Sequence, residues 1–227
     1  MILSPSNLLT CFRKRIMWKT LPCYRVKMAK SSTYWESRYQ DGETGWDLNG
    51  VTPALQEAVK HLPKDTKILI PGCGLAWDGE ALHHAGFTEV YLSDWAPSAK
   101  AAFLRRVPSF PENHFFTEDF FEWAMSPVHA KKFDLVLECT FYCAIPPTLR
   151  PQYVHAMQHL IKPGGKLMGL LFTFPLTEVG PPYGGSMEEY TTRFSHPFKL
   201  ETFASSPLSI APRADKEVFF IATLQTL

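Results

Sequence analysis

Cysteine is scarce in this sequence and forms no CxxC pair. Zinc sites and disulfide frameworks both need paired cysteines, so the pattern favours reduced thiols inside a cell. His83 and His84 are adjacent, point to different sides of a helix and form no chelating pair. We therefore expect a cytoplasmic protein without a metal site. The five cysteines are Cys11, Cys23, Cys73, Cys139 and Cys143.

Two further absences narrow the class of protein. No run of the sequence approaches 18 apolar residues, so we expect no membrane-spanning helix. The GxxxxGK[ST] phosphate loop is also missing, which disfavours a nucleoside triphosphatase.

The formal net charge of +1 hides an uneven distribution. Residues 1–35 hold seven basic residues and no acidic one, so the rest of the chain carries 16 basic and 22 acidic residues. Nucleic-acid binding requires a basic face, which an acidic body does not supply. We therefore expect a small-molecule substrate and no nucleic-acid partner.

The basic segment, residues 1–33, needs its own explanation. It resembles an Arg-rich targeting peptide, or it precedes a true start at Met28. A secretory signal is disfavoured because no apolar core of seven residues precedes a small-residue cleavage site. We favour a disordered, dispensable leader. Residues 34–227 then form one domain, since a chain of 227 residues with 45% hydrophobic content can bury a single sizeable core.

Short apolar runs alternate with amphipathic segments along the chain, which predicts a largely parallel sheet with helices on both faces. Residues 134–139, DLVLEC, contain a continuous apolar run, LVL, which is typical of a central strand covered on both sides. Ligands of such sheets bind at the carboxyl ends of the strands. The expected strands are residues 67–70, 90–93, 114–117, 134–139, 166–172, 198–203 and 217–223, and the expected helices are 52–62, 77–85, 97–107, 147–160 and 186–194.

The most informative motif is KILIPGCGLAWD, residues 67–78, followed by VYLSD, residues 90–94. Gly72 and Gly74 open the left-handed region and let a ligand approach the backbone between strand and helix. Asp94 ends the next strand 20 residues later, where a carboxylate can accept hydrogen bonds from the two hydroxyls of a ribose. The motif predicts a cofactor that contains adenosine.

Trp77 narrows the choice of cofactor. A dinucleotide fingerprint places a third small residue there, so that helix and strand pack closely beside a pyrophosphate. S-adenosylmethionine, which has adenosine but no pyrophosphate, fits better. An NAD-dependent oxidoreductase and a non-catalytic S-adenosylmethionine-binding module remain as alternatives.

From Tyr34 onward the chain resembles the thiopurine S-methyltransferase superfamily, which includes plant thiol and halide methyltransferases and many bacterial members. The first and fourth of the motifs below are much more specific than GCG or KPGG. The matching motifs are YWESRYQDGETGWD (34–47), IPGCG (70–74), EDFFEW (118–123), FDLVLECTFYCAIPPTLRP (133–151), KPGG (162–165) and GPPYGG (180–185).

This resemblance implies a single-domain, Rossmann-like class I methyltransferase fold that binds S-adenosylmethionine, with a seven-stranded sheet of order 3-2-1-4-5-7-6 and strand seven antiparallel. We expect the protein to be a monomer. The aromatic N-terminal segment would fold over the cofactor. Relatives can carry Trp at the position of Tyr39, and plant members carry an aromatic residue at Cys139. The implied cofactor contacts are Trp35, Tyr39, Trp46, Gly72, Asp94, Asp119 and Phe120, to which the glycine turn adds Gly74 and the end of strand four adds Glu138.

The acceptor is expected to be a small soft nucleophile, with a thiol favoured over a halide. A thiol is already a few per cent thiolate at neutral pH, so we expect no dedicated catalytic residue. Cys143 is predicted to be a core thiol, since the methyl group passes directly to the substrate. The candidates for the acceptor pocket are Phe141, Tyr142, Cys143, Arg213 and residues 181–185.

Overall fold

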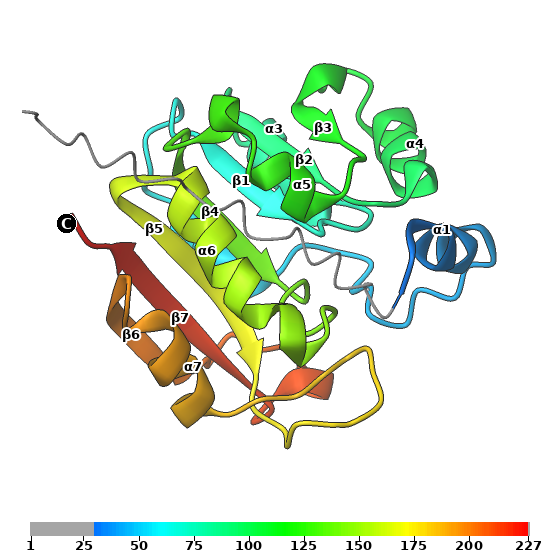
Figure 1. The fold of residues 1–227 in the computed structure, drawn as a ribbon. Helices are drawn as coiled ribbons and strands as arrows, with labels where there is room; N and C mark the ends of the chain where they lie inside the picture. The colour runs from blue at the N-terminus through cyan, green and yellow to red at the C-terminus, as the bar shows by residue number, and fades with distance from the viewer. Residues whose placement is uncertain (1–29, 227) are drawn as a thin grey trace, which may run out of the picture.

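The computed structural model describes residues 30–226 of the protein (Figure 1). Strands and helices alternate along most of this length, as the sequence predicts. The helices are α1 (Ser32–Gln40), α2 (Pro53–Val59), α3 (Trp77–His84), α4 (Pro97–Arg106), α5 (Phe120–Ala124), α6 (Arg150–Leu160) and α7 (Met187–Phe194), with single 3-10 turns at Glu112–His114, Pro127–His129, Pro147–Leu149 and Ala211–Arg213. The strands are β1 (Ile68–Pro71), β2 (Val90–Ser93), β3 (Phe115–Phe116), β4 (Phe133–Cys139), β5 (Ile161–Phe172), β6 (Phe198–Ser205) and β7 (Glu217–Leu224).

The seven strands form one sheet with the order β3-β2-β1-β4-β5-β7-β6. Strands β1 to β5 are parallel to one another, whereas β7 runs antiparallel to both of its neighbours, β5 and β6. The predicted fold, including the antiparallel seventh strand, is confirmed. The parallel strands end on the side of the molecule where α1 lies (Figure 1).

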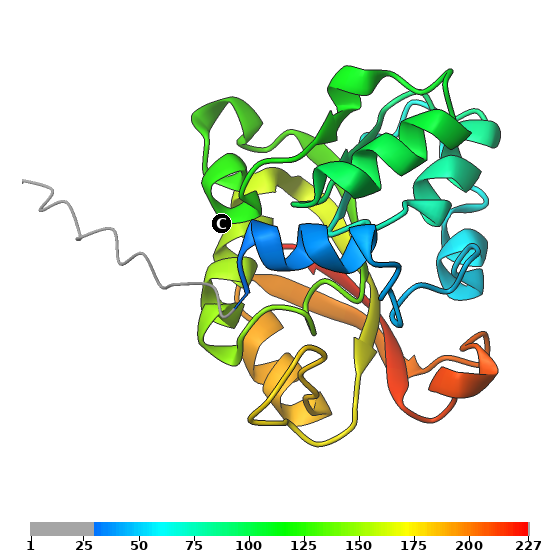
Figure 2. The ribbon, with the colours of Figure 1, turned by 90° about the vertical axis from the view of Figure 1, so that its right-hand side faces the viewer.

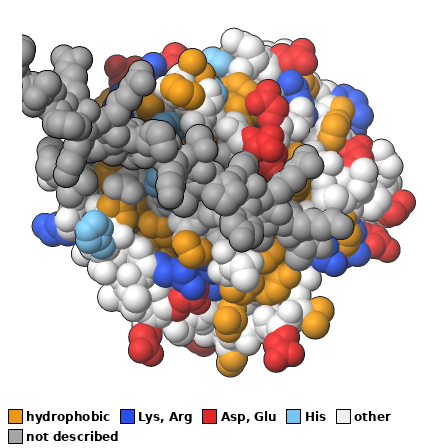
Figure 3. All heavy atoms as spheres, viewed as in Figure 1, with side chains coloured by type: hydrophobic (Ala, Val, Ile, Leu, Met, Phe, Trp, Pro, Cys, Tyr) orange, Lys and Arg blue, Asp and Glu red, His pale blue; other side chains and the backbone are white. Residues whose placement is uncertain are grey.

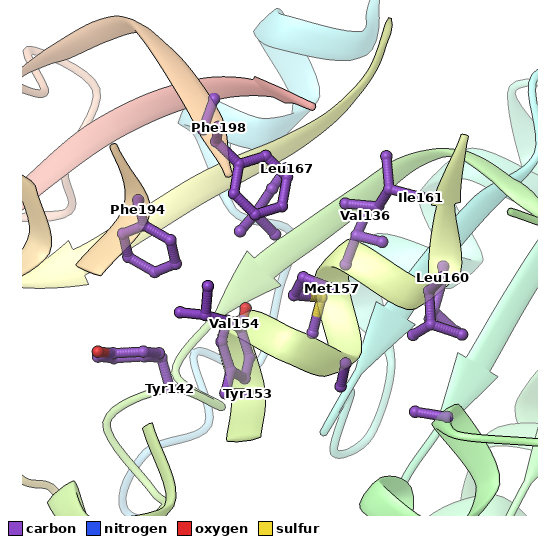
Figure 4. Close-up of a cluster of buried hydrophobic side chains, with 14 of the residues drawn as sticks. Val136, Tyr142, Tyr153, Val154, Met157, Leu160, Ile161, Leu167, Phe194 and Phe198 are labelled. Carbon is purple, nitrogen blue, oxygen red and sulfur yellow. The ribbon is translucent and has the colours of Figure 1, made fainter. Parts of the chain in front are cut away.

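The core lies in two layers because successive strand residues point to opposite faces of the sheet. Leu69, Val136 and Leu167 pack in a cluster with buried side chains of α5, α6 and α7. Their neighbours along the strands pack instead with α2, α3 and α4. Figure 4 shows Met157 and Leu160 of α6 directed toward the strands of the first layer. The two layers hold the sheet rigidly below the site.

Helix α1 was not predicted as a helix. Its residues lack apolar periodicity and none is buried, so the usual signal of a core-facing helix is absent. It begins at an N-cap, Ser31, whose side chain accepts from the Tyr34 amide, and Glu36 attaches it to α4 by accepting from the Ser98 amide at 3.0 Å. Figure 2 shows α1 in front of the strand ends. The helix starts two residues before the predicted domain boundary, and the predicted leader otherwise lies outside the described residues.

Strand β5 is longer than predicted. The KPGG segment was expected to end a helix, yet β5 already begins at Ile161, which pairs with Phe133 before the register shifts. Gly164, with φ +76°, and Gly165, which lies close to the carbonyl of Asp134, let the chain turn within the strand. The strand thus runs directly on from α6.

In residues 30–226, no helix has the length and apolar content needed to cross a membrane. Over the same residues, no three His, Cys, Asp or Glu side chains gather in a way that could hold a metal ion. The described cysteines, Cys73, Cys139 and Cys143, are free thiols, and the other two lie outside the described residues.

Candidate active site

A cavity of about 360 Å³ lies between α1 and the carboxyl ends of the parallel strands. Its volume falls in the range of small-molecule sites. Most lining residues come from the α1 segment and from the loops that follow β1 to β5. The lining comprises Tyr34, Trp35, Arg38, Tyr39, Gly45, Trp46, Gly72, Ser93, Asp94, Trp95, Glu118, Phe120, Thr140, Phe141, Cys143, Ala144, Ile145, Phe172, Pro181, Pro182 and Arg213.

The glycine turn after β1 packs against aromatic side chains. Gly72 and Gly74 both have φ +57°, which favours glycine. A Cβ on Gly72 would lie 2.4 Å from the Phe141 ring, and one on Gly74 would lie 3.0 Å from the Tyr39 hydroxyl. Gly72 lines the cavity, whereas Gly74 is not among the lining residues. The turn therefore packs closely against aromatic side chains of the cavity wall. Gly74 contributes to this packing from outside the cavity.

Asp94 lies at the carboxyl end of β2 and lines the cavity, as the motif predicts. Its Oδ2 accepts from the Gly74 amide at 2.8 Å, and its Oδ1 accepts from the Ala96 amide at 2.9 Å. Burial raises the pKa of Asp94 to about 6, although the amide hydrogen bonds oppose this shift. Each carboxylate oxygen retains a second lone pair, so the group can still accept from ribose hydroxyls.

The aromatic arm brings together Trp35, Tyr39 and Trp46, all of which line the cavity. The ring centroids of Trp35 and Trp46 are 5.4 Å apart, and those of Tyr39 and Trp46 are 5.7 Å apart, both pairs in edge-to-face geometry. Such rings form a wall that attracts cations. These three predicted positions lie together at one side of the cavity.

The two adjacent acids on the predicted adenine side have different positions in the structure. Asp119 does not line the cavity; it is the N-cap of α5 and accepts from the amides of Phe121 and Glu122. Phe120 lines the cavity as predicted, and Glu118 is the acidic residue that lines it. The motif EDFFEW contains two adjacent acidic residues. The residue at which α5 begins determines which of them caps the helix and which lines the cavity.

Glu138 and Tyr142 are core residues and do not line the cavity. Glu138 is 0% exposed and accepts from the Tyr142 amide at 2.8 Å and from the Tyr153 hydroxyl at 2.6 Å. The Tyr142 ring packs among aromatic residues that include Tyr153 and Phe194 (Figure 4). Of the residues in this segment, Phe141 and Cys143 line the cavity, whereas Glu138 and Tyr142 lie behind it.

The opposite end of the cavity is formed by residues that follow β4, β5 and β6. Arg213 donates from Nη2 to the carbonyl of Trp46 at 2.8 Å, and its guanidinium lies 5.5 Å from the centre of the Phe172 ring. Cys143 donates from Sγ to the carbonyl of Thr140. Burial raises the pKa of this thiol, which agrees with a packing role.

Several lining residues were missed, among them Ser93, Trp95, Thr140, Ile145 and Phe172. Ser93 and Phe172 end strands, and Trp95 and Thr140 closely follow them. Their position at or just after the end of an apolar run could have identified these residues, because ligands of parallel sheets bind at the carboxyl ends of the strands.

The geometry fits S-adenosylmethionine better than a dinucleotide. Asp94 offers a ribose acceptor, and Trp35 and Trp46 offer aromatic rings to a sulfonium. Phe141 and Tyr39 pack against the glycine turn, which restricts the close access that the pyrophosphate of a dinucleotide would need there.

Comparisons with known proteins agree. The model of the thiopurine S-methyltransferase family matches residues 30–218. A probable thiol methyltransferase 2 from Arabidopsis thaliana is 33% identical over 200 residues, covering 86% of each chain. Thiocyanate methyltransferase 1 from Brassica oleracea is 33% identical over 81% of each chain. A thiopurine S-methyltransferase from Vibrio parahaemolyticus is 28% identical over 73% of this chain and 82% of its own.

Solved structures support the fold. The 1,6-didemethyltoxoflavin-N1-methyltransferase of Burkholderia thailandensis, with bound S-adenosylhomocysteine, has a TM-score of 0.67 at 16% identity and covers 86% of this chain and 87% of its own. A TehB-like SAM-dependent methyltransferase of Corynebacterium glutamicum has a TM-score of 0.59 at 18% identity, over 86% and 98%. The chain belongs to the thiopurine S-methyltransferase family and is an S-adenosylmethionine-dependent methyltransferase.

Proposed function

We propose that this enzyme methylates the sulfur of a small thiol held at the Arg213 end of the cavity. The single observation that carries the proposal is the charge there: Arg213 supplies a cation, and none of the described residues lining that end is a histidine, lysine or carboxylate. A cation near a thiol favours its ionised form. The site therefore suits a nucleophile that ionises without a protein base.

The carboxylates of the cavity lie at its other end. Asp94 follows β2 and is held through both oxygens by backbone amides, and Glu118 follows β3. The sheet order separates these strands from β5 and β7, near which Phe172 and Arg213 lie. Within the lining of the cavity, the end beside Arg213 thus presents no carboxylate to the acceptor; Asp78 and Glu217, which interact with Arg213, lie outside the lining.

The bound cofactor supplies an electrophilic methyl group on a sulfonium. The chain's contribution is alignment and exclusion of water, which can lower a barrier by roughly 7 to 11 kcal/mol. Trp35 and Trp46 cover one side of the cavity, Phe172 and Pro181 cover the other, and Asp94 anchors the ribose. No residue of this set needs to change its protonation state during transfer.

The enzyme acts as a monomer in the cytoplasm and without nucleic acid. The three described cysteines are free thiols, in keeping with a reducing compartment. On the uncovered part of the face in Figure 3, acidic and basic side chains are interspersed, and this mixture gives no support to a nucleic-acid partner.

The test uses S-adenosylmethionine labelled in its methyl group and two matched series of acceptors, small thiols and their oxygen counterparts, with thiocyanate and iodide added. We expect labelled thioethers and no labelled ethers. Across thiols of different acidity, kcat/KM should rise with pH through the pKa of each thiol. A pH profile that stays the same for all thiols would indicate a protein base and contradict the proposal.

Calorimetry with S-adenosylhomocysteine comes first, because it separates binding from turnover. Binding together with methylation of thiols supports the proposal. Binding without methylation of any acceptor favours the non-catalytic binding module instead.

A further inference from the structure

Arg150, the first residue of α6, is fully buried and lies outside the lining of the cavity. Neither the cofactor motif nor the acceptor candidates include it. A guanidinium with 0% exposure is unusual, since arginine is rarely buried unless it is paired. Its partners therefore indicate what it does.

The guanidinium connects two segments. Its Nη1 donates to both carboxylate oxygens of Glu189 on α7, at 2.9 and 2.8 Å. Its Nη2 donates to the backbone carbonyls of Gly184, at 2.8 Å, and Tyr183, at 3.4 Å. Arg150 thus binds the loop 180–185 on the side that faces the core, and Glu189 fixes the orientation of the guanidinium.

Other contacts leave this loop little freedom. The Tyr183 amide donates to the Cys143 carbonyl at 2.7 Å, and the Gly185 amide donates to the Phe174 carbonyl at 2.9 Å. A Cβ on Gly184 would lie 2.2 Å from the Phe174 carbonyl oxygen. The loop is therefore closely packed on the side away from the cavity.

The same loop carries part of the cavity wall. Pro181 and Pro182 line the cavity at the end where Arg213 and Phe172 lie. Tyr183 and Gly184, which Arg150 holds, follow them directly in the chain. A shift of the Tyr183 or Gly184 carbonyl would therefore also move Pro181 and Pro182, which directly precede these residues in the chain.

We propose that Arg150 is a positioning residue for the acceptor: from the core it fixes the loop 180–185, and with it the wall formed by Pro181 and Pro182. The proposal rests on the proposed function, which places the acceptor at this end. Buried ion pairs add little net stability, but their directional hydrogen bonds can select one arrangement of the chain. Here the hydrogen bonds of Arg150 fix the position of Pro181 and Pro182, and this position sets the width of the cavity at its acceptor end.

The first test compares Arg150→Met, Arg150→Lys and the double variant Arg150→Met with Glu189→Met. The double variant removes both members of the buried pair, which limits the damage to folding that an unpaired buried charge would cause; the partly exposed Arg193, which also pairs with Glu189, loses that partner. We expect the acceptor KM to rise about ten- to a hundredfold, since small misplacements have effects of that size. Binding of S-adenosylhomocysteine should stay within about twofold. Arg150→Lys should recover only part of the loss, because lysine lacks the planar fork.

Arg106 provides a matched control, because it holds a backbone carbonyl at the other end of the cavity. It donates to the carbonyl of Leu75, beside the glycine turn, and to Glu80 on α3. Arg106→Met should therefore weaken S-adenosylhomocysteine binding and leave the acceptor KM nearly unchanged. Folded Arg150 variants with a native acceptor KM, or with equal losses for cofactor and acceptor, overturn the proposal.

A second readout needs neither cofactor nor turnover. Glu178 is exposed just before the loop, so a glutamate-specific protease can cleave there. Cleavage should be at least about tenfold faster in the Arg150 variants than in the native protein and the Arg106 control, because local opening exposes backbone to proteases. Equal cleavage rates overturn the role of Arg150 even if the native enzyme methylates no thiol, an outcome that would by itself overturn only the proposed function.

Discussion

The carboxylate of Asp94 accepts a hydrogen bond from the Gly74 amide at 2.8 Å, so the end of β2 fixes the turn that follows β1. The same carboxylate lines the cavity. One side chain thus shapes the glycine turn and faces the ligand. Its second oxygen, bonded to the Ala96 amide, secures the start of α4.

Asp94→Ala should weaken S-adenosylhomocysteine binding by about 1.5 to 3 kcal/mol, the usual value of hydrogen bonds to a charged group. Calorimetric titration measures this loss. Asp119→Ala is the control, since Asp119 also accepts from two backbone amides but does not line the cavity. The control should lose about 1 kcal/mol of folding stability and keep its affinity. Unchanged affinity in Asp94→Ala would remove this residue from the site.

Trp35→Leu should reduce affinity for the cationic cofactor more than for its neutral product. Attraction of a sulfonium to an aromatic face contributes up to about 2 kcal/mol and is absent for the thioether of S-adenosylhomocysteine. The ratio of the two dissociation constants isolates this effect from packing. Trp77→Leu is the control, because Trp77 lies outside the lining and donates to Asp47. Equal losses for both ligands in Trp35→Leu would point to packing alone.

Gly72→Ala should destabilise the protein more than Gly164→Ala. Both glycines have positive φ, which costs an alanine about 1 to 2 kcal/mol. Only at Gly72 would the new methyl group also meet the Phe141 ring, at 2.4 Å, whereas nothing lies within 4 Å at Gly164. We expect an additional loss of about 1 to 3 kcal/mol from overpacking, measured by urea denaturation. Equal losses would show that Phe141 moves aside freely.

Glu138→Gln should reduce the pH dependence of folding stability. Burial raises the pKa of Glu138 to about 7 from its ordinary value of 4.5, so the folded state keeps a proton that the unfolded chain releases. The contribution of Glu138 is therefore largest below pH 4.5 and falls, by an amount on the order of 3 kcal/mol, as the pH rises to about 7.

Urea denaturation of the cofactor-free protein at pH 5 and pH 8 measures that change. The native protein should be less stable at pH 8, and the difference should shrink in Glu138→Gln. Asp94 contributes in the same direction because burial raises its pKa to about 6, so a residual difference is expected. An identical difference in both proteins would show that Glu138 stays ionised in the fold.

The fold was predictable because its signals are local. A short, mostly apolar run such as Val90–Ser93 and a proline at the first turn of α4 can be recognised without knowledge of their neighbours in space. The sheet order came instead from the resemblance to a family. Helix α1 was missed because polar contacts, such as the one between Glu36 and Ser98, hold it in place rather than an apolar stripe.

The site was predictable by segment but not by side chain. The aromatic arm and Asp94 lie where expected, since each has one chemically distinctive residue at a defined place. In contiguous runs the sequence does not determine which neighbour lines the cavity: Glu118 lines it and Asp119 does not, and Phe141 and Cys143 line it and Tyr142 does not. Which of two neighbours faces inward depends on dihedral angles such as the φ of +65° at Thr140, which no pattern of residue types announces.

The antiparallel direction of β7 has a practical consequence. Glu217 pairs with Phe172 at the cavity end of β5, so the strand carries the chain to Leu224 at the far end of the sheet, away from α1 (Figure 1). An affinity tag or a surface tether joined beyond Leu224 would therefore leave the cavity mouth open. The same attachment placed just before Ser31 would sit beside the arm that covers the cavity. When acceptor binding is measured on immobilised protein, the end of the chain chosen for attachment determines whether the solid surface blocks access to the cavity.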